Sequence, residues 1–405
     1  MKISILTDSI SAGGGAGVIA WNHARALKDH GHDVSVVVTS ANFVEEGIKE
    51  ENGIIIYTIH SNYRLLWRAY KSLNNPVVVR KVKNILEKIK PDIVHAHNLH
   101  LHLSYRSLRI AREIARGVFL TVHDAMPFHY SKLFPGTVRM RGGEVLSYKV
   151  PVWEQFRLFK WQFNPLRNII IKKYLKIPDK IFAVSGALAS ALSDNGIGNV
   201  EILHNAIDVT EWKNTPIING DGKDLIFFGG RLSAVKGGDI IMEAIQDILP
   251  EKPNTRLLVV GVEDKYTEEM KNKSKGLGRD DLILFTGWKK RDQMKDMYPL
   301  STLVVVPSLC FDWFPTVVLE AMASGRPVIV GCFGGAKELV IEGKTGFVVN
   351  PRNPKELLDK ILYLLHNKKK ADEMGRAGYE RVKDHFSMEK YMETLLSWYD
   401  KAFKK

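Results

Sequence analysis

Short apolar runs alternate with amphipathic helical stretches along nearly the whole chain, and this alternation most constrains the fold. Helical patterns cover residues 16–30 and 77–90, for instance, and Pro91 ends the second. The runs of the first half occupy 3–6, 34–38, 54–59, 93–94, 118–122, 181–184 and 200–203. Strands that alternate with helices in this way predict a parallel sheet with helices on both faces, the doubly wound α/β architecture.

The second half of the chain repeats the scheme. Its runs occupy 225–228, 256–260, 282–285, 303–306, 328–330 and 347–349. Between the halves, residues 206–223 are rich in Asn, Pro, Gly and Asp, which are typical of a linker. We therefore expect two Rossmann-like domains, 1–205 and 224–385, with ligands beyond the carboxyl ends of the strands and one cleft between the facing domains.

Composition excludes several classes of protein. A chain of 405 residues with 45% hydrophobic residues has enough apolar material for two or three globular domains. Cys310 and Cys332 cannot build a disulfide framework or a cysteine-based metal site, which fits a reducing cytoplasm. The first apolar run stops at Asp8, too early for a secretory signal, and no run approaches the roughly 18 apolar residues of a spanning helix. We expect a cytoplasmic protein.

Positive charge is concentrated in the first half. Residues 1–205 hold 27 Lys and Arg against 16 Asp and Glu, whereas 206–405 hold 31 against 29. Residues 52–180 alone hold 23 against 7, with aromatic side chains interleaved. Such a surface attracts phosphates of nucleic acids, lipid headgroups or a phosphorylated acceptor. Nucleic acid is disfavoured as a partner, because no zinc-finger, helix-turn-helix or RNP pattern appears.

A glycine-rich loop, 13–17, follows the first strand and precedes a helix. Its backbone amides, at Gly14 and Gly15 above all, can approach a phosphate or a sugar closely. The dinucleotide fingerprint fails, because it requires glycine where Val18 stands and the second strand has no ribose-binding acid after it. A phosphate-binding Walker loop fails as well, because Glu338 replaces the first glycine before 343–345. A nicotinamide dehydrogenase and an ATPase are therefore disfavoured.

The second half combines cations and acids at strand ends. Arg231 and Lys236 lie five residues apart after the strand 225–228 and before a helix, which predicts a diphosphate site that needs no metal ion. Asp312 lies in the loop after the strand 303–306, and Glu320 lies early in the following helix. One acid is expected to face the mouth of the cleft and the other its floor.

These segments resemble the retaining glycosyltransferases of family 4, which have the GT-B fold. The resemblance rests on Gly230-Arg231-Leu232 with Lys236, on Asp312 and Glu320 with the run 320–328 (Glu-Ala-Met-Ala-Ser-Gly-Arg-Pro-Val), on 334–338 (Gly-Gly-Ala-Lys-Glu), and on the segments 121–124, 184–185 and 204–208. It implies transfer of a sugar from a nucleotide diphosphate donor, a UDP-sugar or a GDP-sugar, with retained configuration and without a metal ion or other cofactor. It also implies that the C-terminal helix, 386–405, packs back on the first domain. The chain departs from the family pattern at Asp312, usually Glu, and at Ala206, usually Gly.

The resemblance assigns roles to individual residues. Arg231 and Lys236 would hold the departing diphosphate, whose growing charge they stabilise. Glu320 would accept hydrogen bonds from the ribose hydroxyls, and Asp312 would bind hydroxyls of the sugar. His123 would contact the donor sugar near the reaction centre. The remaining donor-side residues are Gly334, Gly335, Ala336 and Trp288, and the acceptor-side residues are Gly14, Gly15, His97, Asn98, Ser185 and Asn205.

Two features leave alternatives open. His95, His97, His100 and His102 invite a metal site, but no carboxylate lies among them and their spacing spreads them from a strand into a loop, so no metal is expected. Residues 139–176 carry nine cations and two acids among aromatic residues, which favours a segment that lies on an anionic membrane and therefore a lipid-linked saccharide acceptor. The alternatives are a soluble acceptor, as in a sugar-phosphate glycosyltransferase, and a nucleotide-sugar epimerase.

Overall fold

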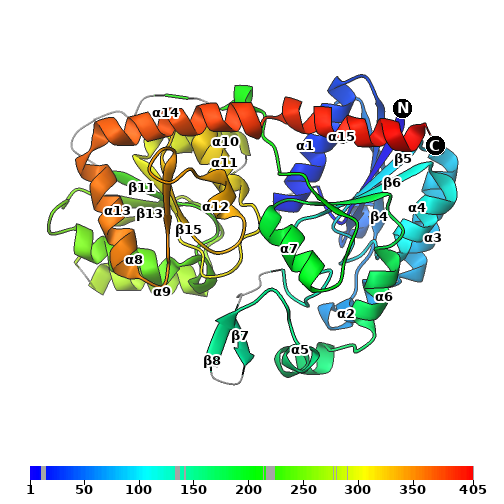
Figure 1. Cartoon of the computed structure of the whole chain (residues 1–405), viewed down its shortest axis with the longest axis horizontal. Coiled ribbons are helices and arrows are strands. Elements are labelled where there is room, and N and C mark those ends of the chain that lie inside the picture. Colours follow the sequence, from blue (N-terminus) through cyan, green and yellow to red (C-terminus); the bar gives the residue numbers. More distant parts are fainter. Residues whose placement is uncertain are drawn as a thin grey trace. The chain divides into compact units, whose positions relative to one another are not determined.

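The computed structural model describes residues 1–10, 15–132, 137–140, 143–212, 214–215, 224–276, 278–279, 281–289 and 291–404. The chain forms two compact units, which are coloured by sequence in Figure 1. Unit 1 contains Met1–Asn205 together with Tyr391–Lys405, and unit 2 contains Ala206–Lys390. Each unit is built around its own parallel sheet.

The sheet of unit 1 has eight strands. Their order is β10 (Val200–Ile202), β9 (Lys180–Ala183), β6 (Gly117–Val122), β5 (Ile93–His97), β1 (Lys2–Thr7), β2 (Asp33–Ser40), β4 (Ile54–His60) and β3 (Gly47–Glu51). All neighbours pair in parallel except β3, which runs antiparallel to β4 at the edge. Strand β3 was not predicted from the sequence, because all five of its residues are exposed and carry no alternating apolar pattern.

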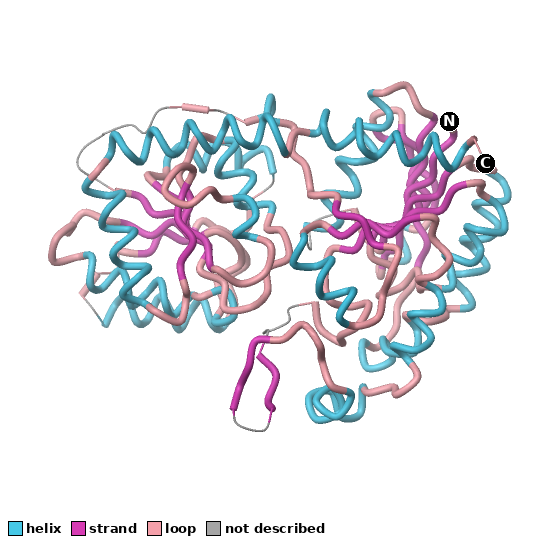
Figure 2. Tube along the Cα trace, viewed as in Figure 1, coloured by secondary structure: helices cyan, strands magenta, loops and turns pink. Residues whose placement is uncertain are grey.

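Helices cover both faces of this sheet (Figure 1). Helices α1 (Gly15–Asp29) and α15 (Met388–Phe403) lie on one face, and α3 (Pro76–Ile89) and α4 (Arg106–Ile114) lie on the other. The expected end of the helix before Pro91 is confirmed, because Lys90 takes the left-handed conformation with φ 51°. The remaining helices are α2 (Arg68–Lys71), α5 (Val152–Phe159), α6 (Arg167–Tyr174) and α7 (Gly186–Asp194), and β7 (Thr137–Met140) pairs with β8 (Gly143–Leu146) in a separate hairpin, seen in Figure 2.

Unit 2 contains a six-stranded sheet that is parallel throughout. Its order is β13 (Ile283–Phe285), β12 (Arg256–Val259), β11 (Leu225–Phe228), β14 (Leu303–Val306), β15 (Val328–Gly331) and β16 (Gly346–Val349). In chain order this is 3-2-1-4-5-6, the arrangement of dinucleotide-binding Rossmann folds. The strand order therefore places the switch point between β11 and β14, where the predicted cations and acids lie.

Unit 2 holds its helices against the sheet with an aliphatic core. Ile241, Ile245, Leu357, Ile361 and Leu364 are completely buried between two helices and the strands. The helices are α8 (Gly238–Ile248), α9 (Lys265–Gly276), α10 (Arg291–Met297), α11 (Thr316–Ala323), α12 (Ala336–Leu339), α13 (Pro354–His366) and α14 (Lys368–His385). Short 3-10 helices in the two units span Phe43–Glu45, Leu65–Trp67, Lys160–Gln162, Val209–Glu211, Ala234–Lys236 and Tyr298–Leu300. Within the described part of the chain, every helix is too short or too polar to cross a bilayer.

Candidate active site

The predicted site residues follow the carboxyl ends of parallel strands in both units. His97 is the last residue of β5 and His123 follows β6 in unit 1. Lys236 lies in the connection after β11 and Asp312 in the connection after β14 of unit 2. This is the edge at which open α/β sheets bind ligands, because the connecting loops and helix N-termini gather there.

Lys236 and Asp312 form an ion pair in unit 2. Ser308 Oγ donates a second hydrogen bond, of 3.3 Å, to the same Oδ2 of Asp312. The two charged side chains are only 17% and 15% exposed. Burial is the largest single influence on Lys236 and opposes its charge, but the Asp312 carboxylate and the Cys310 side chain together raise the pKa of Lys236 above its usual value. The ammonium is therefore charged at neutral pH, although the sequence analysis assigned the two residues to different parts of the donor.

The loop that carries Asp312 is fixed by Gly334 and Gly335. Asp312 and Gly334 form an isolated β-bridge, and the Gly335 amide donates to the carbonyl oxygen of Asp312 at 2.7 Å. Gly334 has φ 76°, and a Cβ atom there would lie 2.3 Å from the Asp312 carbonyl oxygen. Only glycine satisfies both requirements, so this position holds Asp312 in place through the backbone.

Glu320 is anchored by a tyrosine that the sequence analysis missed. Tyr298 Oη donates to Glu320 Oε2 at 2.8 Å, and the Tyr298 ring is completely buried and stacks on Phe227. No local signal marks Tyr298, because it comes from a 3-10 helix that precedes β14 by a few residues. Arg231 is exposed just after Gly230, and Trp288 is 58% exposed in the segment after β13.

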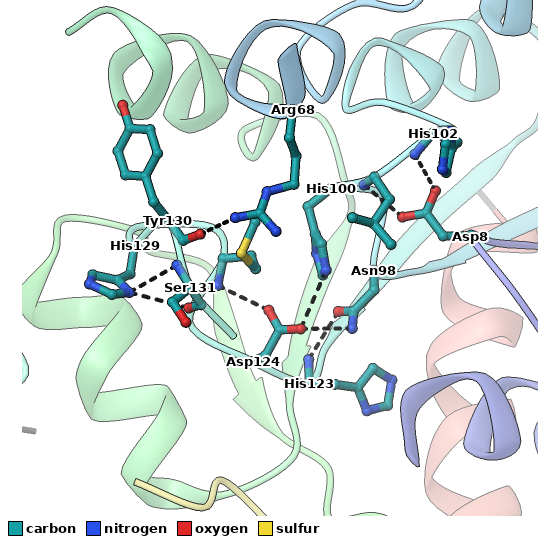
Figure 3. Close-up of polar contacts among 12 residues, drawn as sticks. Asp8, Arg68, Asn98, His100, His102, His123, Asp124, His129, Tyr130 and Ser131 are labelled. Atoms are coloured by element: carbon teal, nitrogen blue, oxygen red, sulfur yellow. Dashed lines mark hydrogen bonds and ion pairs between the residues drawn. The ribbon is translucent and has the colours of Figure 1, made fainter. Parts of the chain in front are cut away.

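In unit 1, Asp124 is the centre of a buried polar cluster (Figure 3). Its Oδ2 accepts a hydrogen bond of 3.1 Å from Asn98 Nδ2 and lies 3.4 Å from His100 Nε2, while its Oδ1 accepts from the Met126 amide at 2.9 Å. Burial raises the pKa of Asp124 to about 6. The Asn98 side chain also accepts from the His123 amide at 3.4 Å, so Asp124 and Asn98 together fix the backbone at His123.

Asp8 is a second buried carboxylate that the sequence analysis did not assign to the site. Its side chain accepts hydrogen bonds of 2.8, 2.8 and 2.9 Å from the amides of Leu101, His102 and Leu103. Burial nevertheless raises the pKa of Asp8. Its place directly after β1 was the one available signal, since a polar residue at a strand's carboxyl end faces the ligand edge. Asp8 thereby holds the loop that follows Asn98.

The structure brings two predicted residues of unit 1, His97 and His123, into direct contact. His97 Nδ1 and His123 Nε2 are hydrogen-bonded at 2.9 Å, and Asn98 lies beside both. Ser185 Oγ caps α7 by accepting from the Leu188 amide at 3.1 Å, and Asn205 is buried. Gly15 begins α1, whereas Gly14 lies outside the described residues.

The four histidines that invited a metal site do not converge. His100 faces Asp124, and His102 Nδ1 is 2.9 Å from Ser61 Oγ. His95 and His97 instead gather with His23, a residue of α1 that the sequence analysis did not consider, and one nitrogen from each ring lies within 4.8 Å of the others. This is the one histidine group of metal-binding proximity in the described part of the chain.

Comparison with known proteins identifies the family of this chain. The model described as "Glycosyltransferase Family 4" matches residues 13–211, and the model described as "Glycosyl transferases group 1" matches residues 209–381. Spore coat protein SA of Bacillus subtilis is 31% identical over 186 residues, 44% of this chain and about half (49%) of that protein. An uncharacterized glycosyltransferase of Methanocaldococcus jannaschii is 25% identical over 91% of this chain and 93% of its own. A sulfoquinovosyl transferase of Arabidopsis thaliana is 23% identical over 90% of this chain and 66% of its own.

Solved structures show the same fold. Sucrose-phosphate synthase from Thermosynechococcus elongatus superposes with a TM-score of 0.78 at 18% identity, over 100% of this chain and 99% of the other. Anabaena HepE, in complex with UDP and glucose, superposes with a TM-score of 0.71 at 20% identity, over 98% of each chain. Because the two family models together span both units and the two sheets are doubly wound, the chain belongs to glycosyltransferase family 4, whose members have the GT-B fold.

Proposed function

We propose that the protein is a retaining glycosyltransferase that moves a sugar from a nucleotide diphosphate donor to a saccharide acceptor without a metal ion or other cofactor. The observation that carries this proposal is the buried Lys236–Asp312 pair beside the glycine-rich connection after β11. It supplies a fixed cation at the switch point of the sheet, where a diphosphate would lie. The complex of HepE with UDP and glucose supports a nucleotide sugar as the donor.

Retention of configuration is proposed to follow from attack on the same face that the diphosphate leaves. The acceptor hydroxyl oxygen bonds to the anomeric carbon while the bond from that carbon to the diphosphate oxygen breaks. The electron pair of the broken bond stays on the diphosphate, which takes the proton of the acceptor hydroxyl. Arg231 and Lys236 stabilise the charge that develops on the leaving group. Isolation of a covalent glycosyl-enzyme, lost on replacement of one carboxylate, would contradict this mechanism.

A thermal-shift panel tests the donor site. UDP, GDP, ADP and NAD are added separately at about 1 mM, with and without EDTA, and a ligand at about 100 times its Kd stabilises a protein by about 2.7 kcal/mol. We expect a shift with UDP or GDP that EDTA does not change. Glu320→Ala should abolish this shift, because it removes the proposed acceptor for the ribose hydroxyls. Glu268→Ala, an exposed acid on α9, is the matched control. A shift that requires a metal ion, or none with any nucleotide, would contradict the proposed site.

We further propose that the acceptor is lipid-linked and that unit 1 binds an anionic membrane from the cytoplasmic side. The supporting observation is an aromatic surface formed by α2, α5 and the neighbouring 3-10 helices, which contact one another. Its exposed members include Leu65, Leu66, Trp67, Tyr70, Val152, Trp153, Phe156 and Trp161, of which Trp161 is 92% exposed. Lys71, Arg157 and Lys160 lie in the same segments. Exposed aromatic side chains among cations match the interface of an anionic bilayer.

Vesicle sedimentation tests the membrane proposal. The protein should bind vesicles that contain phosphatidylserine, and binding should fall in high salt because the attraction of lysines to the lipid is screened. Trp161→Ser should weaken this binding severalfold. Phe43→Ser is the control, because Phe43 is also exposed, at 68%, but lies among the acids Glu45 and Glu46. Equal binding to neutral and anionic vesicles would contradict the proposal and favour a soluble acceptor.

A further inference from the structure

A continuous chain of hydrogen bonds connects the C-terminal helix α15 with His123. It contains one tyrosine and four histidines, which come from α15, α1, β5 and the end of β6. Tyr399, His23, His95 and His97 are all at most 1% exposed. The contacts are Tyr399 Oη to His95 Nδ1 at 2.6 Å, Tyr399 Oη to His23 Nε2 at 3.3 Å, His23 Nδ1 to His97 Nε2 at 2.9 Å, His97 Nδ1 to His123 Nε2 at 2.9 Å, and His95 Nε2 to Thr121 Oγ1 at 2.7 Å.

The four imidazole rings in this series of hydrogen bonds are uncharged. Burial lowers the pKa of His23 and of His123 to about 3, and it lowers the pKa of His95 and of His97 well below the usual value. A neutral imidazole has one N–H donor and one unprotonated acceptor nitrogen. Each ring that accepts on one side must therefore donate on the other, so the direction of a single hydrogen bond fixes the direction of all the bonds from Tyr399 to His123.

The hydroxyl of Tyr399 sets this direction, because it has one proton for two histidine neighbours. The distance of 2.6 Å to His95 Nδ1 is typical of a hydroxyl that donates, and the longer contact of 3.3 Å fits a weak N–H donor from His23. Tyr399 thus donates to His95 and accepts from His23 Nε2. His97 Nε2–H then donates to His23 Nδ1, and His123 Nε2–H donates to His97 Nδ1.

The outer nitrogen of His123 is then unprotonated. Figure 3 shows the His123 ring directed away from Asp124 and Asn98, and Nδ1 forms no hydrogen bond to any residue in the described ranges. An unprotonated imidazole nitrogen accepts a hydrogen bond from a hydroxyl group, whereas the other tautomer would present an N–H donor, to which that hydroxyl could serve only as the acceptor.

We propose that Tyr399, His23 and His97 are positioning residues that hold His123 in its Nε2–H tautomer, so that His123 presents an acceptor nitrogen to a substrate hydroxyl. The inference rests on the proposed function for the identity of that substrate as a sugar, but the tautomer itself is a property of the free protein. The proposal gives helix α15 a role in the site, although Tyr399 is 276 residues beyond His123 in the sequence.

Nuclear magnetic resonance of the ligand-free protein tests the tautomer directly. In protein labelled with ¹⁵N at histidine, long-range ¹H–¹⁵N correlations distinguish a protonated from an unprotonated ring nitrogen, and His123→Gln identifies the signals of His123. We expect a protonated Nε2 and an unprotonated Nδ1 between pH 6 and 8. A protonated Nδ1 in the wild-type protein would overturn the proposal even if no variant folds.

Tyr399→Phe tests whether Tyr399 sets the direction of these hydrogen bonds. It removes the acceptor of His23 Nε2–H, and since an unpaired buried N–H is costly, the chain of bonds should reverse and protonate His123 Nδ1. Tyr391→Phe is the matched control, because Tyr391 lies on the same helix with its ring 5.6 Å from that of His23, yet no hydrogen bond joins its hydroxyl to the four histidines. A Tyr399→Phe protein that is folded by circular dichroism and keeps the wild-type tautomer would overturn the proposal.

A second readout connects the tautomer with the substrate. With the donor found in the nucleotide panel, the matching nucleotide sugar should bind Tyr399→Phe about tenfold more weakly than Tyr391→Phe, while the free nucleotide binds both equally. Unchanged sugar binding despite a reversed tautomer would overturn the role toward the substrate. Failure of the panel itself would contradict the proposed function but leave the tautomer measurement valid, because that measurement needs no ligand.

Discussion

Lys236→Met is expected to lower kcat by about 100- to 1,000-fold, the loss typical of removing one group that stabilises charge in a transition state. The ammonium is paired with Asp312, whose carboxylate also accepts a hydrogen bond from Ser308, so in the proposed mechanism it needs no reorganisation when the diphosphate departs. Methionine keeps much of the volume of lysine but carries no charge. Initial rates with the donor identified by the nucleotide panel measure the effect.

Loss of the ion pair must be separated from loss of catalysis, because Lys236→Met leaves Asp312 without its cation. The double variant Lys236→Met/Asp312→Asn removes both charges and should recover stability but not kcat. Lys265→Ala is the control for a lysine in unit 2, since its side chain is 92% exposed and its contact with Glu269 is 4.0 Å long. A Lys236→Met protein with nearly wild-type kcat would show that another group stabilises the leaving diphosphate.

The free energy of unfolding is expected to fall steeply as the pH drops below about 6.5. The folded-state pKa values of His23 and His123 are about 3, and those of His95 and His97 are also well below 6.5, so the unfolded chain binds protons that the folded chain excludes. Each such histidine approaches a slope of about 1.4 kcal/mol per pH unit between its folded and unfolded pKa values. Asp124 has the opposite effect. Its pKa is raised to about 6 in the folded protein, so it increases the free energy of unfolding as the pH falls from 6 toward 4.

Urea unfolding at pH 7, 6 and 5 measures this dependence. The pKa of Asp8 is raised like that of Asp124, so both carboxyl groups oppose the effect of the histidines. The four histidines take up more protons on unfolding than these two groups release, so the free energy of unfolding still falls as the pH falls. His95→Gln should reduce the slope of the free energy of unfolding against pH by about 1.4 kcal/mol per pH unit, the contribution of one proton, because one buried imidazole is removed. A stability independent of pH between 7 and 5 would show that the histidine cluster is protonated or hydrated in the folded state.

The periodicity of the sequence determined the regular structure of both units. All thirteen predicted runs coincide with strands, because a buried parallel strand must be almost continuously apolar and its residues record that burial. The edge strand β3 escaped prediction because its five residues are exposed and carry no alternating apolar pattern, and the hairpin of β7 and β8 was not predicted either. Motifs at strand ends likewise located Arg231, Lys236, Asp312 and His123.

Tertiary structure alone decided how these residues act on one another. Lys236 and Asp312 are 76 residues apart, Tyr298 reaches Glu320 from another element, and Tyr399 joins His23 and His95 from the C-terminal helix. A local pattern reports which side of an element is buried, but it carries no information on which distant element covers that side. The partners of a polar side chain depend on the order of the strands and on the helices that pack over them, and these are properties of the folded chain as a whole.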